Sequence, residues 1–261
     1  EYTSLAVGFS KDWAEQDLFL SVGYAEVEAL VGNPMNSSVG YSSWTYFNDV
    51  DRDNPSLGVS QFEIPERMSA FLRWSPTLFA DLQSRFSLTW SHNKGRPYSF
   101  VFNGYPDMRG DALDGDGDNM LLYVPTGPND PNVVFADGFD TDAFFAMMDS
   151  YGFERGAFVD RGQHYSPWYA RLNFKFEQML PGLRTNDQSS VFFTIRNLGN
   201  FLNDEWGIYN FQSDHDIVDG QALNDGVDQY YIYRNFRGLR DKGRSGRGSS
   251  YLVKIGFSYR F

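Results

Sequence analysis

The sharpest chemical motif in this sequence is DGDGDN, a stretch that begins at residue 114 and alternates aspartate with glycine. Asp114, Asp116 and Asp118 have the spacing with which calcium-binding loops open, and carboxylate oxygens are the ligands that Ca²⁺ prefers. The match to an EF-hand loop ends there, because its sixth position holds Asn119 instead of glycine and its twelfth holds Pro125 instead of glutamate. Two interpretations stay open: a solvated acidic loop tip, or a Ca²⁺ site that other loop residues complete.

Acidic and basic residues are concentrated in two different stretches of the chain. Residues 104–165 are acidic, which indicates either a solvated surface or a segment that captures cations. Residues 234–247 (RNFRGLRDKGRSGR) are basic, which indicates either contact with anionic surface groups or salt bridges to the acidic stretch. The net charge of −12 argues against nucleic acid as a partner, since binding to its backbone needs a basic field.

No catalytic constellation can be drawn from the sequence, which predicts that the chain is not an enzyme. The three histidines, His92, His164 and His215, lack the i, i+4 spacing of a zinc site, and neither GxSxG nor HExxH occurs. Ser91 beside His92 is the one weak candidate for nucleophilic chemistry. A polar residue with a structural role is the stronger interpretation of that pair.

The elements that must position these residues are predicted to be β-strands. Seven segments alternate apolar with polar side chains, which is the period of a strand. They cover residues 3–11, 17–30, 66–74, 84–92, 167–178, 190–197 and 249–261. The aromatic content of 18% suits a β protein, and no apolar run is long enough for a transmembrane helix. Residues 139–150 favour a short helix, with Phe144, Phe145, Met147 and Met148 on its buried face.

Short and long connections between these segments alternate without exception. The three short ones are DWAEQ, SPTLFADLQ and MLPGLRTNDQS, and the three long ones cover about 30–60, 104–165 and 202–248. Outer-membrane barrels sort their connections in this way, with short turns at the periplasmic rim and long loops outside. We therefore predict an all-β fold, an antiparallel transmembrane β-barrel. A soluble β-sandwich is the alternative, since its strands show the same alternation.

The last segment has the two faces that a barrel wall needs. Its odd-numbered side chains are predicted to face lipid and to form the strand that the assembly machinery recognises: Tyr251, Val253, Ile255, Phe257, Tyr259 and Phe261. The polar faces of the last three segments supply the residues predicted to face the lumen: Arg171, Lys175, Arg196, Lys254 and Arg260. A charge inside a barrel needs a partner, so we expect these residues to form structural ion pairs and not to select a substrate.

Five stretches, taken in order, resemble the C-terminal part of a TonB-dependent outer-membrane receptor of the Oar-like branch. They are NKGRPYSFVFNG, GDALDGDGDNMLLYVP, FERGAFVDRGQHYSPWYARLNFKFEQ, FFTIRNLGNFLNDEWG and the terminal GFSYRF. The resemblance runs from about residue 60 to the end and is looser before it. It implies a larger, roughly 22-stranded barrel with a plug domain inside. Residues 1–261 would supply only the last seven strands, with no plug, and the rest would come from upstream sequence or another chain.

The resemblance implies that the whole receptor takes up a substrate across the outer membrane of a Gram-negative bacterium. The expected partners are outer-membrane lipid and lipopolysaccharide, the remaining barrel and plug, and TonB, which would contact an N-terminal part. No cofactor is expected apart from Ca²⁺ at the aspartate motif. Two alternatives stay open: an outer-membrane scaffold or surface interaction protein, and a secreted Ca²⁺-binding β-sandwich.

Overall fold

The computed structural model describes residues 1–35, 37–104, 119–184, 187–224 and 229–261. The fold is mostly antiparallel β-sheet, with 51% strand and 13% helix. The prediction of an all-β antiparallel fold is confirmed in this form, and closure into a barrel stays a prediction. Among the described residues, no helix is long and apolar enough to cross a membrane.

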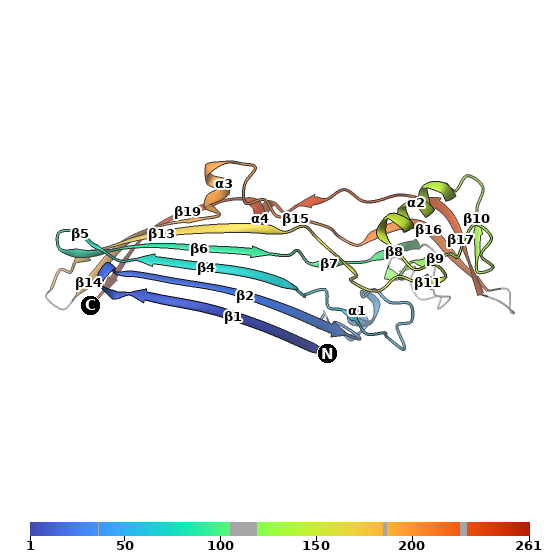
Figure 1. Cartoon of the computed structure of the whole chain (residues 1–261), viewed down its shortest axis with the longest axis horizontal. Helices are drawn as coiled ribbons and strands as arrows, with labels where there is room; N and C mark the ends of the chain where they lie inside the picture. Colours follow the sequence, from blue (N-terminus) through green and yellow to red (C-terminus); the bar gives the residue numbers. More distant parts are fainter. Residues whose placement is uncertain (36, 105–118, 185–186, 225–228) are drawn as a thin grey trace.

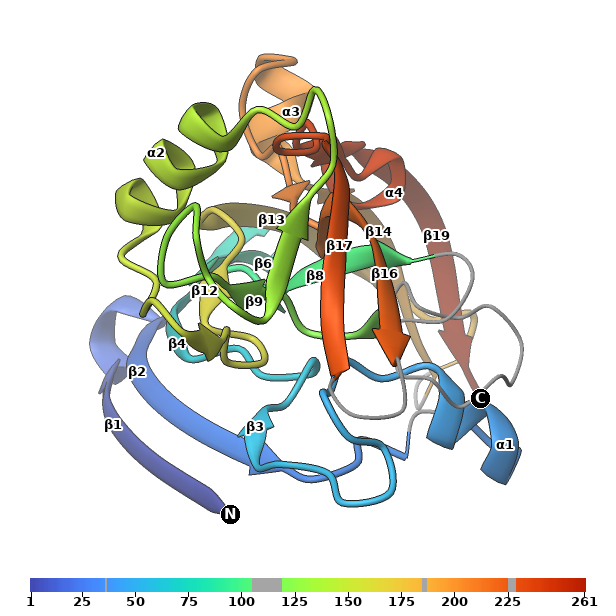
Figure 2. The ribbon, with the colours of Figure 1, turned by 90° about the vertical axis from the view of Figure 1, so that its right-hand side faces the viewer.

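The seven alternating segments form one sheet in which each main strand pairs with the next along the chain. Its main strands are β1 (Tyr2–Trp13), β2 (Leu18–Val31), β4 (Glu66–Trp74), β6 (Leu82–Asn93), β13 (Tyr169–Pro181), β14 (Gln188–Arg196) and β19 (Leu252–Arg260). The short turns, which include η1 (Ala14–Gln16) and β5 (Thr77–Phe79), all lie at one end, with the C-terminus (Figure 1). The view along the strands shows a curved trough that runs from β1 to β19 (Figure 2). Neither β1 nor β19 pairs along its outer edge with a described strand.

The register of the sheet brings apolar side chains together on one face. Phe193 pairs with Ile255 across β14 and β19, and with Phe176 across β14 and β13. Phe176 in turn pairs with Phe86 of β6, which pairs with Trp74 of β4. Because side chains alternate along a strand, these pairings extend the apolar face across the sheet.

The three long connections between the strands fold together at the other end of the sheet; we call residues 32–65, 94–168 and 197–251 the loop domain. The loop domain contains a four-stranded sheet with the order β10 (Val133–Phe135), β17 (Gln229–Phe236), β16 (His215–Asn224) and β8 (Phe100–Gly104). The pairs β10–β17 and β16–β8 are parallel, and each joins two different connections. Helix α2 (Thr141–Tyr151) lies beside this sheet (Figure 2).

The smaller elements of the loop domain are short. They are α1 (Gly40–Thr45), β3 (Gly58–Val59), β7 (Pro97–Tyr98), β9 (Tyr123–Val124), β11 (Ala157–Phe158), β12 (His164–Tyr165), α3 (Leu198–Leu202), β15 (Asn210–Phe211), β18 (Gly243–Arg244) and α4 (Gly246–Ser249).

The predicted helix over 139–150 is confirmed by α2, and its ends follow from its sequence. Asp140 caps the first turn by accepting a hydrogen bond from the Ala143 N–H at 2.9 Å, and Gly152 ends the helix at φ 69°. Phe144 and Met148 are fully buried, whereas Phe145 and Met147 are partly buried against the same core. The helix therefore closes one side of the loop domain with the face that the sequence predicts.

The buried hydrophobic core lies in the loop domain and not beneath the large sheet. Its central side chains include Phe100, Phe102, Ile217 and Tyr233, each exposed by 1% or less. None of the 18 buried residues in this core comes from the seven main strands of the large sheet. The loop domain thus has a hydrophobic core of its own, whereas the apolar face of the large sheet stays exposed.

Candidate functional site

The apolar face of the large sheet carries exposed side chains from β1 to β19. Of the residues predicted to face lipid, Ile255 is 76% exposed and Phe257 is 64% exposed. Tyr251, Val253 and Phe261 are exposed as well, and Tyr259 is partly buried and donates its hydroxyl hydrogen bond to Asp187. At the opposite edge of the sheet, Val7 and Phe9 are 63% and 59% exposed. Most of these side chains stay exposed among the described residues, and their contact with lipid stays a prediction.

Aromatic rings form two rows across this face, one toward each end of the strands. Near the short turns, Trp74 stacks on Phe86 at 5.4 Å between ring centroids, and Phe86 lies 4.9 Å from Phe176. Toward the loop domain, the His92 ring lies between Trp90, at 5.8 Å, and Trp168, at 4.8 Å. His92 therefore belongs to the apolar face.

Ser91 points to the opposite face of β6 from His92, because neighbouring side chains alternate along a strand. The two residues that the sequence singles out as a weak nucleophilic pair are thus separated by the sheet. The two residues therefore do not form a site together.

Helix α3 and the turn that follows it add exposed apolar side chains on the outer side of the sheet, where both ribbon views place the helix (Figures 1 and 2). Phe201, Leu202 and Trp206 are 45%, 65% and 57% exposed. The Phe201 ring contacts Tyr251 edge-on at 5.2 Å, which joins this patch to the C-terminal strand. The exposed apolar surface of the sheet therefore continues onto this patch, where β19 meets the loop domain.

The opposite face of the sheet carries the residues predicted to face the lumen, and one carboxylate organises part of it. Glu177 forms ion pairs with Lys175 at 3.0 Å and with Arg85 at 3.5 Å, and it accepts a hydrogen bond from the Ser190 hydroxyl at 3.2 Å. Lys175 therefore has a carboxylate partner on the same strand, and its place in a lumen stays a prediction.

The other four predicted lumen residues are placed on the same polar face by the register, but the described part of the chain offers them no ion pair. Arg171 donates to the Gly248 carbonyl at 2.7 Å. Arg196 and Arg260 stand at the two ends of the β14–β19 pairing, and Lys254 pairs with Thr194 between them. Their partners, and the lumen itself, stay predictions.

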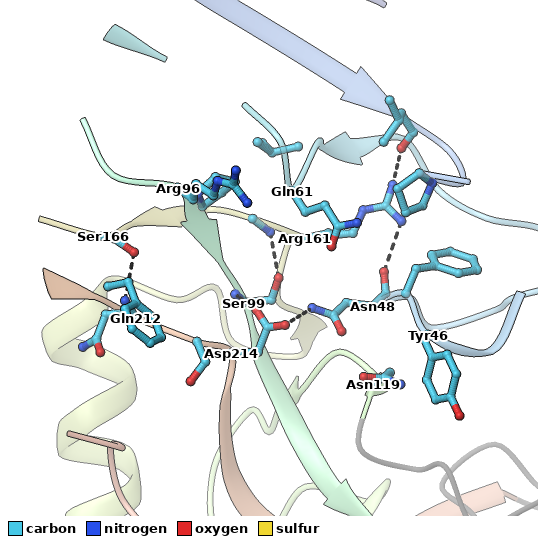
Figure 3. A pocket seen from close by; sticks show the side chains of 18 of the residues that line it. Tyr46, Asn48, Gln61, Arg96, Ser99, Asn119, Arg161, Ser166, Gln212 and Asp214 are labelled. Atoms are coloured by element: carbon cyan, nitrogen blue, oxygen red, sulfur yellow. Dashed lines mark hydrogen bonds between the residues drawn. The ribbon is translucent and has the colours of Figure 1, made fainter. Parts of the chain in front are cut away.

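A cavity of about 350 Å³ lies where all three long connections meet (Figure 3). Much of the cavity lining is polar. The polar residues labelled in the figure are Tyr46, Asn48, Gln61, Arg96, Ser99, Asn119, Arg161, Ser166, Gln212 and Asp214. Phe47, Tyr209 and Phe211 add aromatic surface. A volume of this size admits a small polar molecule.

A buried ion pair forms one wall of the cavity. The Arg161 guanidinium lies 3.2 Å from the Asp49 carboxylate, and their side chains are 7% and 2% exposed. Arg161 also donates to the carbonyls of Asn48 at 3.1 Å and Ser56 at 2.9 Å, and to that of Val31. Burial lowers the pKa of Arg161, and the Asp49 charge opposes that shift. The guanidinium thereby holds three backbone segments together, so the ion pair has a structural role.

Gly58 is required beside this ion pair. A Cβ at Gly58 would lie 2.7 Å from Arg161 Nε and 2.8 Å from its Cβ, closer than real contacts allow. Glycine at this position therefore lets β3 approach the guanidinium.

A second carboxylate, Asp214, is placed in the cavity by two donors. It accepts hydrogen bonds from the Ser99 N–H at 2.6 Å and from the Asn48 amide at 2.8 Å. Burial raises the pKa of Asp214, and the two hydrogen bonds and the Arg240 charge oppose the shift. Asp214 joins the first connection to the second and third, and its carboxylate lines the cavity.

Two further side chains leave hydrogen-bonding capacity at the cavity. Gln212 donates its backbone N–H to the Ser166 hydroxyl at 3.0 Å, while its side-chain oxygen is buried without a partner among the described residues. Arg96 is exposed and forms no ion pair with them. The cavity can thus offer a cation, amides and an acceptor to a polar ligand.

The histidines His164 and His215 lie in an aromatic cluster behind the cavity. The Phe100 ring lies 5.5 Å from His164 and 5.1 Å from His215, and Tyr98 contacts both. The Nε2 atoms of both are buried without a hydrogen-bond partner among the described residues. His215 Nδ1 accepts from the Arg240 N–H at 3.1 Å, and burial lowers the pKa of both imidazoles. The sequence shows both residues but gives no signal that they meet.

Arginines of the basic stretch 234–247 form ion pairs with carboxylates of the same long connection. Arg237 lies 3.5 Å from Asp216 and 3.4 Å from Asp219, and Arg240 also pairs with Asp216. These ion pairs differ from the expected salt bridges to residues 104–165. They arise because β16 and β17 form a hairpin that brings its two ends together.

The aspartate motif, Asp114, Asp116 and Asp118, lies outside the described residues, so the Ca²⁺ prediction stands as a prediction. Within the part of the chain that the structure describes, no group of three or more His, Cys, Asp or Glu side chains could hold a metal ion. No protein-family model matches this chain, and neither the curated proteins nor the solved structures contain a significant match to it.

Proposed function

We propose that this chain is a section of the wall of an outer-membrane β-barrel, with its loop domain outside the cell. The observation that carries the proposal is the apolar face of the large sheet, which is exposed from Phe9 in β1 to Ile255 in β19. A monomeric soluble protein rarely exposes a contiguous apolar patch of more than a few hundred Å². Lipid covers such a face without any second protein layer.

Strand length and aromatic placement support the same proposal. Strands β4, β14 and β19 have nine residues each, close to the roughly 9–11 residues that a tilted strand needs to cross a membrane. The two aromatic rows, with Trp74 in one and Trp168 in the other, stand where outer-membrane barrels carry their aromatic girdles. Phe201 and Trp206 of the outward patch suit the lipid headgroup region.

At a finer level, we propose that the whole protein is a TonB-dependent receptor that imports a substrate. The support is the sequence resemblance, together with a polar face opposite the lipid face and a polar cavity in the loop domain. In such a receptor the remaining strands would pair with the open edges of β1 and β19, and the plug would lie against the polar face.

A second candidate function is that of an outer-membrane scaffold that displays a binding domain. The observation in its favour is the packed core of the loop domain, in which Phe102, Phe144 and Tyr233 have no exposed surface. Connections with a shared core present a rigid surface to a partner. By contrast, a soluble β-sandwich would bury the apolar face of the large sheet under a second sheet. The hydrophobic core described above contains no residue of that face.

The membrane proposal can be tested with cysteine labels, because the chain contains no cysteine. We would compare Ile255→Cys with Lys254→Cys, two neighbours on opposite faces of β19. With an environment-sensitive fluorophore in reconstituted vesicles, the label at 255 should shift to the blue and be quenched by lipid-borne quenchers. The label at 254 should respond to aqueous quenchers. Equal aqueous access at both positions would refute the membrane wall.

The receptor proposal needs its own experiment on the intact gene product. Photo-crosslinking in cells should give a TonB adduct with the natural protein. A natural protein that reaches the outer membrane without forming that adduct would favour the scaffold.

A further inference from the structure

Three arginines from three separate segments converge on a second cavity of about 340 Å³. Arg171 comes from β13, Arg196 from the end of β14, and Arg247 from α4 just before β19. Asn197, Ser250, Tyr251 and Leu252 complete the lining, which contains no carboxylate. The cavity therefore combines three positive charges with no internal counter-charge.

Two of these guanidinium groups are unpaired within the described chain. Arg171 donates one hydrogen bond to the Gly248 carbonyl at 2.7 Å, which holds it beneath α4. Arg196 and Arg247 are exposed and form no hydrogen bond or ion pair through their side chains with the described residues. The protein has 34 acidic residues against 22 basic ones, so unpaired arginines do not arise from a shortage of carboxylates.

We propose that Arg171, Arg196 and Arg247 form a binding site for the phosphate group of a small ligand. Like charges that share a site repel one another, and an anion between them converts that repulsion into attraction. A single carboxylate is satisfied by one guanidinium fork, whereas a phosphate carries about −1.5 to −2 charges and three acceptor oxygens. Three guanidinium groups match the three oxygens.

The position of the site favours a soluble phosphate ester over a lipid headgroup. Arg171 and Arg196 belong to the polar face of the sheet, opposite the exposed apolar side chains. Asn197 Nδ2 donates to the carbonyls of Gly207 at 2.9 Å and Ser249 at 2.7 Å, which holds the segment that carries Arg247 against the end of β14. The site depends on these contacts only, so it does not rest on the proposed membrane function.

The experiment is a calorimetric titration of the full chain, in detergent, with inorganic phosphate and separately with micelles that contain phosphatidic acid. Arg196→Gln and Arg247→Gln should each weaken phosphate binding about tenfold or more, because each removes a charge-assisted hydrogen bond. Arg260→Gln is the matched control, since it removes an arginine from the other end of the same strand pair. The control should bind phosphate as the unmodified chain does.

The outcomes separate the sources of the phosphate group. Binding of inorganic phosphate that depends on Arg196 and Arg247 supports the proposal with a soluble ligand, and arginine-dependent binding of phosphatidic acid alone supports it with a lipid. No binding of either probe overturns it, as does equal binding by all variants. Arg196→Lys keeps the charge but loses the planar fork, so it should retain part of the affinity and shows that the site is folded.

Discussion

Arg161 and Asp49 form a buried ion pair, 3.2 Å apart, between residues that are 112 positions apart in the chain. Asp49 also accepts from the N–H groups of Val50 at 2.8 Å and Ser56 at 3.1 Å, so its carboxylate is surrounded by donors. The pair joins the first long connection to the second, and the cavity of the loop domain is built on it.

We predict that Arg161→Leu lowers the free energy of unfolding of the loop domain by about 3–5 kcal/mol, since removal of one partner leaves a buried charge unpaired. Chemical denaturation followed by near-ultraviolet circular dichroism measures the change. The control is Arg155→Leu, which breaks an ion pair with Asp149, a carboxylate that is 68% exposed. That change should cost about 1 kcal/mol or less. Equal effects would mean that the buried pair is not the organising contact.

The loop domain should lose stability as the pH falls below about 6.5, the ordinary pKa of histidine. Burial lowers the pKa of His164 and His215, so the unfolded chain binds protons at a higher pH than the folded chain does. Each histidine can remove at most about 1.4 kcal/mol per pH unit until the pH reaches its folded pKa. The raised pKa of Asp214 acts in the opposite direction, because the folded state then binds its proton more readily as the pH falls.

His164→Phe tests this pH dependence, since the ring sits among Tyr98, Phe100, Tyr151 and Phe153 and phenylalanine suits that environment. The loss of melting temperature between pH 7.5 and pH 5.5 should be smaller in this variant. His92→Phe, on the outer face of β6, should leave the loss unchanged. An unchanged loss in His164→Phe would assign the pH dependence to other groups.

In a membrane, Ile255→Arg should destabilise the sheet by about 2–4 kcal/mol, the cost of an arginine on the lipid face of a barrel. Ile255 is 76% exposed, so in a soluble protein the same change would cost almost nothing. Urea unfolding in vesicles measures the difference, with Lys254→Arg as the neighbouring control. A neutral result for Ile255→Arg would contradict the proposed lipid contact.

Asn197→Ala should lower stability by about 2–3 kcal/mol, because it removes two hydrogen bonds and leaves alanine in a left-handed conformation. Asn197 has φ 54° and is 1% exposed, and its amide donates to Gly207 and Ser249. Asn197→Gly should recover the backbone part of the loss. Asn200→Ala, which removes hydrogen bonds near the surface, should cost less than Asn197→Ala in the same thermal assay.

The large sheet was predictable from sequence because its information is local. Alternation along a single strand reveals both the strand and its two faces, and the segment predicted at 66–74 coincides with β4. Three of the six pairings then follow from the short turns, which leave each strand next to its neighbour in the chain, whereas the other three span the long connections. Closure of the sheet beyond β1 and β19 stays a prediction, since neither strand pairs along its outer edge with a described strand.

The loop domain was not predictable in the same way, because its contacts are remote. Strand β8 is short, and its parallel pairing with β16 joins Phe100 to His215 across more than a hundred residues. No periodic signal marks Arg161 and Asp49 as partners, and Arg247 gives no sign that it meets Arg171 and Arg196. Charges and apolar runs in a long connection identify candidates, but their partners are set by packing between connections.

The parallel pairing of β10 with β17 and of β8 with β16 has a consequence for the order of folding. Each pair needs a segment from the second connection and one from the third. The β8–β16 pairing therefore needs residues up to Gly220, and the β10–β17 pairing needs residues up to Tyr233. Contacts between remote segments form slowly because the chain between them must first be closed into a loop. We therefore expect the loop domain to mature last, so that a folded loop domain marks a chain whose preceding strands are already in place.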